Sequence, residues 1–210
     1  MAVAWLCTAR SNPKIVAELT WDELQNSDPQ IRKAQQRIAL ANEGGKPVPE
    51  ENIPRTFFIS RSALDERKPF TKALTPLAMN GFWIFSDALA ATISTFDLGG
   101  AKFLPITALM ADRKTPLPGS YSILNFNAVK PALLLDDSTL PPGFSRVVPR
   151  AVYSIADDGL VLSAAALEGP DLWSDPKMGG GFFVSDPLAQ ALRRDGFFDW
   201  FDFKSCRIIA

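Results

Sequence analysis

The sequence predicts an α+β fold, a largely antiparallel sheet with a few helices. Short apolar or alternating segments typical of strands recur along the chain and are separated by turns that contain glycine or proline. Helical patterns are few, and two of them directly follow a strand candidate. The 210 residues are 47% hydrophobic and 21% charged, which is typical of a globular protein with one full core.

The N-terminal part of the chain contains one strand candidate and one long helical pattern. Apolar side chains alternate along residues 2–7 as they do in a half-buried strand. Asp28 is a suitable N-cap, Pro29 suits the first helical position, and one helical face then carries Ile31, Ala34, Ile38 and Ala41. We therefore expect residues 1–54 to form a strand, a helix and a linker that pack on a main domain of residues 55–210.

Two later segments share one order of elements: a strand, a Ser-Asp pair, a helix and a second strand. Ser86 follows the apolar run 82–85, and Ser185 follows the run 182–184. Each serine can accept a hydrogen bond from an orphan backbone N–H, so each predicts a helix start. The second strands are predicted at 102–106 and 200–206. Internal duplication and the chance recurrence of good capping residues are equally compatible with this pattern.

Three further segments complete the predicted sheet. Residues 55–61 and 121–127 carry the β-branched and aromatic side chains that strands favour. Residues 150–163 predict a hairpin, because two apolar arms flank Asp158-Gly159, a dipeptide favoured in two-residue turns.

Histidine is absent from the chain, and this absence excludes His-based triads, general bases and zinc motifs. Cys7 and Cys206 lie at opposite ends without CxxC spacing, so they predict buried free thiols in a reducing compartment. A bridge between terminal strands is the alternative. We expect no cofactor, no metal and no catalytic residue, although carboxylate or metal-dependent catalysis is not forbidden by the sequence.

The charge pattern argues against nucleic acid and against a membrane. The net charge is −1, and no run of lysine and arginine supplies the basic surplus that phosphate binding requires. No apolar run approaches the roughly 20 residues of a membrane span. The first residues also lack the basic start of a signal peptide, so we expect a cytoplasmic protein.

Several features allow a catalytic or ligand-binding interpretation, and in each case the structural alternative is favoured. A nucleophilic Ser86 or Ser185 needs an activating base, whereas a cap needs none. The glycine run at 179–181 leads into a strand candidate, which favours a turn over a phosphate cradle. The acidic pairs at 136–137 and 157–158 should point to opposite sides of their segments, as solvated loop carboxylates rather than metal ligands.

The segment 169–178 is the candidate partner-binding patch. It is a loop interrupted by proline and glycine, and it brings together Asp171, Trp173, Asp175, Lys177 and Met178. Tryptophan and methionine are enriched at interfaces, and tryptophan is a frequent anchor of binding energy. A Trp173 ring packed beneath the loop is the favoured alternative. The aromatic segment 197–201 would indicate a dimer or partner surface only if its rings are exposed.

Four pieces of the sequence carry a family resemblance. They are WIFSDAL with FLPI (83–89 and 103–106), YSILN with its downstream acidic pair (121–125), DLW after the hairpin (171–173), and FVSDPLA before the last strand (183–189). In this order the chain resembles the eleventh family of immunity proteins from bacterial polymorphic-toxin systems. The resemblance covers the chain after residue 80, whereas the preceding part matches only loosely.

This resemblance implies an intracellular protein that binds a cognate toxin and neutralises it by occlusion. It implies no catalytic residues and no established contact residues. A carboxylate- or metal-dependent enzyme is one alternative, for which acids with shifted pKa values should converge in a deep pocket. A small-molecule-binding adaptor is the other, for which an apolar pocket is expected. A homo-oligomer is compatible with each of these functions.

Overall fold

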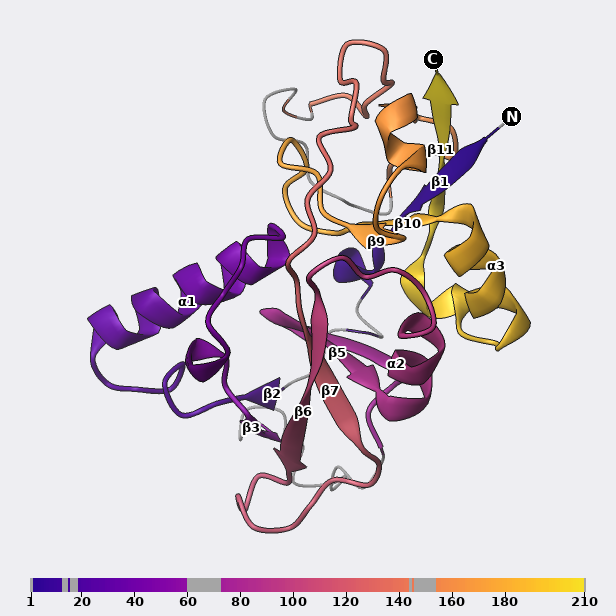
Figure 1. The fold of residues 1–210 in the computed structure, drawn as a ribbon. Coiled ribbons are helices and arrows are strands. Elements are labelled where there is room, and N and C mark those ends of the chain that lie inside the picture. The colour runs from indigo at the N-terminus through magenta and orange to yellow at the C-terminus, as the bar shows by residue number, and fades with distance from the viewer. Residues whose placement is uncertain are drawn as a thin grey trace.

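The computed structural model describes residues 2–12, 15, 19–59, 73–143, 145 and 154–209. These residues form two mixed sheets and three α-helices, which confirms the predicted α+β fold (Figure 1). Between the named strands, every pairing is antiparallel except β3–β6 and β8–β11. No helix in these described ranges combines the length and the apolar character that crossing a bilayer requires.

The first sheet has six strands in the order β2-β3-β6-β7-β5-β4. Their bounds are β2 Leu19–Thr20, β3 Thr56–Ile59, β4 Leu77–Asn80, β5 Phe82–Ser86, β6 Lys102–Leu109 and β7 Tyr121–Asn125. The second sheet has five strands in the order β8-β11-β1-β10-β9. Their bounds are β1 Val3–Leu6, β8 Leu160–Ser163, β9 Leu172–Trp173, β10 Phe183–Ser185 and β11 Lys204–Ile209. The helices are α1 Pro29–Glu43, α2 Asp87–Ile93 and α3 Asp186–Arg194.

Strand β1 occupies the centre of the second sheet. It runs antiparallel to both neighbours, with Ala4 opposite Ser185 of β10 and opposite Cys206 of β11. The N- and C-terminal strands therefore lie side by side (Figure 1). Leu6 of β1 is fully buried in the core of this sheet. Residues 1–54 thus supply a central strand to the second sheet, as well as β2 and α1.

The two sheets repeat one arrangement of strands. In the first sheet, β7 lies antiparallel between β5 and β6, and α2 connects these two neighbours. In the second sheet, β1 lies antiparallel between β10 and β11, and α3 connects them. The outer strands correspond as well, because β3 is parallel to β6 as β8 is to β11. Strand β4 precedes β5 and pairs with it antiparallel, as β9 does with β10. β1 therefore takes the place in the second sheet that β7 takes in the first.

The same arrangement extends to the helix starts. The Oγ atoms of Ser86 and Ser185 each accept a hydrogen bond from the backbone N–H three residues later, at 3.3 Å, which confirms both predicted caps. The backbone N–H groups of the two serines also donate to the outer strand of their sheet at 2.8 Å, to Pro76 O and to Asp171 O. This shared register is stronger support for a repeated unit than the capping residues alone.

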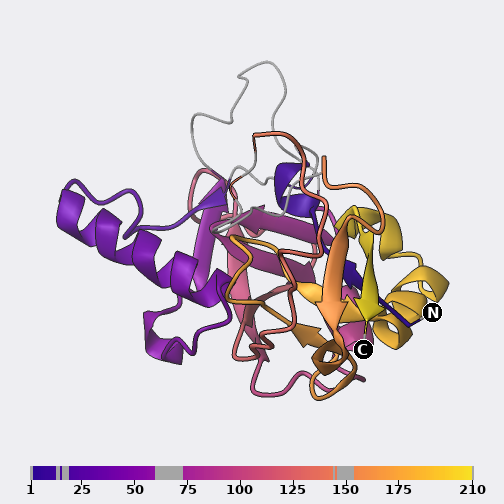
Figure 2. The same cartoon turned by 90° about the horizontal axis from the view of Figure 1, so that it is seen from above.

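The predicted apolar face of α1 is confirmed only in its C-terminal half, where Ile38 and Ala41 are half-buried against the core of the first sheet. Ile31 is 38% exposed and Ala34 is exposed, whereas the buried residues of the helix are Ala39, Asn42 and Glu43. The physical reason is that α1 contacts the sheets only near its C-terminal end and extends away from them over the rest of its length (Figure 2). The predicted N-cap is confirmed, because Asp28 accepts a hydrogen bond from the Gln30 N–H at 2.8 Å.

The predicted hairpin at 150–163 is also different in the structure. The turn exists, with Asp158 in the left-handed region at φ 58° and a hydrogen bond from the Gly159 N–H to Ala156 O. Residues 150–153 lie outside the described residues, and residues 154–155 do not belong to a strand. Among the described residues, β8 pairs in parallel with β11, which is distant in the sequence.

Both cysteines are buried and free, as predicted. Burial raises the pKa of the Cys7 thiol far above its ordinary value, and it raises the pKa of Cys206 to about 12. Because the thiolate is the reactive form, these thiols are expected to be inert in the folded chain.

The central position of β1 can be tested with two substitutions in the same strand. Leu6→Ala should lower the free energy of unfolding by about 2–5 kcal/mol, because it leaves a cavity in a closed core. Val3→Ala, at a half-buried position, should lower it by no more than about 1 kcal/mol. Urea denaturation of both variants measures the difference, and equal effects would argue against a central β1.

Candidate partner-binding surface

The structure places the predicted anchor Trp173 inside the protein. Its side chain is fully buried, and its ring stacks on that of Phe183 with the centroids 5.7 Å apart. The ammonium nitrogen of Lys130 covers the ring at 3.8 Å from the ring centroid. In this conformation Trp173 cannot contact a partner, and the alternative favoured by the sequence, a ring packed beneath its loop, is what the structure shows.

Asp175 and Met178 are also buried, at 2% and 6% exposure. One carboxylate oxygen of Asp175 accepts hydrogen bonds from the backbone N–H groups of Ala132 and Leu133, at 2.8 and 2.7 Å. The other oxygen accepts from the Lys177 N–H at 2.8 Å. Asp175 therefore joins two chain segments and has a structural role, because three backbone donors depend on it.

Two of the five predicted residues reach the surface, and both have partners within the protein. Lys177 is exposed, and its ammonium donates to Leu133 O at 2.9 Å. Asp171 is half-buried and accepts from the Ser185 hydroxyl at 2.5 Å. The predicted segment therefore forms no continuous exposed patch. It contributes one wall of a groove whose other wall lies far away in the sequence.

This groove, of about 540 Å³, lies between the C-terminal end of α1 and the segment 175–180. Leu40 stands at its edge with 61% of its surface exposed. Arg10, which follows β1, crosses the groove and forms an ion pair with Glu43 at 2.6 Å. Gly180 has φ 77°, and a Cβ atom there would collide with the Arg10 guanidinium, so the position requires glycine. The glycine run thus serves chain packing, as the turn interpretation predicts.

The exposed face of α1 continues from this groove. There Leu40 lies beside the exposed cations Lys33 and Arg37, because at about 100° per residue these three positions share one side of the helix, whereas Ile31 lies on the other side. Neither cation forms an ion pair with any residue that the structure describes, and the same holds for Lys46 beside the groove. We call this combined surface, the exposed face of α1 together with the groove, the α1 surface.

The sequence did not predict the α1 surface, because the apolar residues of α1 have the spacing of a helix face that is buried in a core. The signal that was available is the helix's charge, since Arg32, Lys33 and Arg37 stand within two turns and only Asp28 and Glu43, at the ends, oppose them. A buried helix face rarely neighbours so many cations. The cations of α1 therefore indicate an exposed helix, although the spacing of its apolar residues predicts a buried face.

The other sequence-predicted candidates have local roles in the structure. The aromatic rings of Phe197, Phe198 and Trp200 are half-buried against the core beneath α2 and α3. The Arg193 guanidinium covers the Phe198 ring, at 4.0 Å from its centroid. In the described ranges, no group of three or more acidic or cysteine side chains is arranged as a metal site would be.

A comparison with protein families decides the classification. The model of the Immunity protein family (Imm11) matches residues 9–207 of the 210. The chain belongs to the Imm11 family. The match confirms the resemblance seen in the sequence and extends it toward the N-terminus as far as residue 9, so that it includes α1. No curated protein matches the sequence.

The buried position of Trp173 in this Imm11 protein gives a direct test. Trp173→Ala should lower the free energy of unfolding by about 3–5 kcal/mol, because the ring fills a closed core. Leu167→Ala, at a position that is 61% exposed, should change it by no more than about 0.5 kcal/mol. Thermal and urea denaturation compare the two, and a Trp173→Ala variant as stable as the parent would show that the ring lies at the surface.

Proposed function

We propose that this Imm11 protein binds a cognate bacterial toxin in the cytoplasm and neutralises it by covering the toxin's active surface with the α1 surface. Family membership carries the proposal of toxin immunity. It also supports a role without catalysis, in preference to a carboxylate- or metal-dependent enzyme. Occlusion requires complementary shape and charge and no chemistry by the immunity protein itself.

The α1 surface supports the proposed mechanism through its geometry. A helix that extends away from the sheets offers a convex ridge, which can enter a concave active site (Figure 2). The groove at its end, with Leu40 at the edge and Met178 in its wall beside charged side chains, offers a recess of mixed polar and apolar character for a side chain of the partner. Helix and groove are held together by the Arg10–Glu43 ion pair, so the surface is preorganised.

The charge of the α1 surface suggests the chemistry of the partner. Lys33, Arg37 and Lys46 lack ion pairs with the described residues, although the whole chain has a net charge of −1. A local cationic surface on a nearly neutral protein favours an acidic partner surface, and complementary charge mainly raises the association rate. We therefore expect carboxylates on the toxin where it meets α1.

Co-expression tests the function itself. This protein should co-purify in a stoichiometric complex with the secreted protein encoded beside it, and it should rescue the growth of cells that express that protein. A protein that elutes alone or as a homo-oligomer, without rescue of growth, would contradict the immunity function.

The role of α1 is tested with charge reversal. Lys33→Glu combined with Arg37→Glu should slow association with the toxin by at least about tenfold at low salt, because like charges then face each other. Lys114→Glu, at an exposed position between β6 and β7, is the matched control and should leave the rate unchanged. Stopped-flow or surface-binding kinetics measure both, and equal rates for all three proteins would exclude α1 from the interface.

A further inference from the structure

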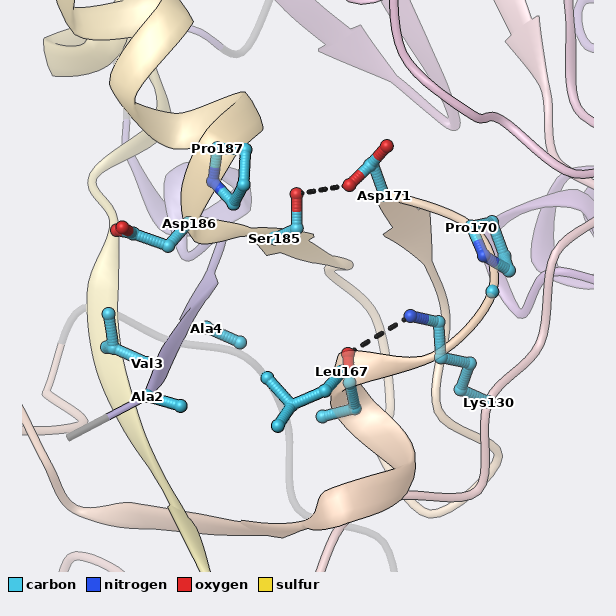
Figure 3. A pocket seen from close by; sticks show the side chains of 12 residues that line it. Ala2, Val3, Ala4, Lys130, Leu167, Pro170, Asp171, Ser185, Asp186 and Pro187 are labelled. Carbon is cyan, nitrogen blue, oxygen red and sulfur yellow. Dashed lines mark hydrogen bonds between the residues drawn. The ribbon is translucent and has the colours of Figure 1, made fainter.

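A second cavity lies at the start of α3, at the opposite end of β10 from the groove's glycine run. It has a volume of about 280 Å³, at the lower limit of the roughly 300–1,000 Å³ that ligand sites occupy. Residues from four parts of the chain line it: the start of β1, Lys130, the segment 166–171, and Ser185 with the first turn of α3 (Figure 3). A cavity of this size fits a short ligand or one side chain of a partner.

Lys130 is the one cation among the lining residues, and it is 7% exposed. Its ammonium donates to Ala166 O at 3.2 Å and lies over the Trp173 ring (Figure 3). None of the ion pairs in the described part of the chain includes Lys130. An ammonium has three N–H donors, so Lys130 has hydrogen-bonding capacity left for an acceptor in the cavity.

The carboxylates around the cavity are engaged elsewhere. Asp171 accepts from the Ser185 hydroxyl and, with its other oxygen, from the Asp97 N–H at 3.1 Å. Asp186 accepts from the Trp5 indole N–H at 2.9 Å, and its side chain turns away from the cavity (Figure 3). Burial lowers the pKa of Lys130 to about 8, while Asp171 and Asp97 act in the opposite direction. Thus the nearby acids compensate the buried ammonium only in part.

The remaining wall of the cavity is apolar. Val3, Leu167, Pro170 and Pro187 surround the space in front of Lys130 (Figure 3). Leu167 is 61% exposed, which leaves it available to cover a ligand. A single buried donor group beside an apolar wall is the combination that orients small ligands in protein sites.

We propose that this cavity binds a carboxylate group attached to a short apolar body, with the carboxylate on the Lys130 ammonium and the body against Leu167 and the two prolines. The ligand's carboxylate makes a direct contact with the ammonium, which Asp171 and Asp97 compensate only in part, and its apolar body replaces water against an apolar wall. Such a carboxylate belongs either to a free small molecule or to an acidic side chain or chain terminus of a protein partner. The proposal stands independently of toxin binding at the α1 surface.

Titration with hexanoate tests the chemistry directly, with 1-hexanol as the probe that has the same body without the charge. In protein labelled with ¹³C-lysine, hexanoate should shift the Lys130 Cε resonance saturably and raise the pKa of Lys130, because a carboxylate stabilises the ammonium. Hexanol should do neither. Shifts that are spread equally over all lysines, or that are the same for hexanol, would overturn free-carboxylate binding.

Three variants complete the test. Lys130→Met retains the length of the side chain over Trp173 and should weaken hexanoate binding at least about tenfold, the equivalent of one charge-assisted contact. Leu167→Glu places a like charge at the exposed edge and should weaken it similarly, whereas Leu167→Gln loses only the apolar contact and should weaken it less. The Leu167 pair keeps the test valid even if Lys130→Met is unstable.

The same variants distinguish the two sources of the carboxylate. If hexanoate binds and toxin affinity is unchanged in Lys130→Met and Leu167→Glu, the ligand is a small molecule. If hexanoate fails but both variants weaken the toxin complex at least about tenfold while Leu167→Gln weakens it less, the carboxylate comes from the protein partner. If neither hexanoate binding nor toxin affinity responds to these variants, the proposal is wrong, and this result leaves immunity through the α1 surface unaffected.

Discussion

The insertion of β1 between β10 and β11 is the constraint on which the rest of the structure depends. This strand joins the two ends of the chain in one sheet, and its pairings span the full length of the sequence. It also places both candidate sites. Arg10, just after β1, crosses the groove at the end of α1, and the start of β1 forms one wall of the Lys130 cavity.

The repeated arrangement of strands explains how one chain can have a rigid shared core and still carry different features in its two halves. Helices α2 and α3 start with the same Ser-Asp cap and pack against each other over one core that both sheets share. The shared core supplies stability, because it buries apolar surface from both halves. The parts that differ between the halves, α1 beside the first sheet and the Lys130 cavity beside the second, are then free to carry function.

The two candidate sites use charge in different ways. On the α1 surface the cations are exposed, so water and salt screen them, and they affect the speed and selectivity of association more than its strength. Lys130 is buried, so each contact that it makes has greater energetic weight, and losing or gaining one acceptor matters. The exposed α1 surface is therefore suited to a protein partner, and the Lys130 cavity is suited to a single ligand group.

The helix starts and their caps follow from local sequence, whereas tertiary packing determines which faces of the elements are buried. The caps at Ser86 and Ser185 could be predicted because the bonding partners lie three residues apart, within the reach of local sequence reasoning. The exposed face of α1, the burial of Trp173 and the lone ammonium of Lys130 could not, because each depends on segments distant in the sequence. Apolar side chains are buried more often than polar ones, but the elements that pack around a given side chain determine whether it lies in the core or at the surface.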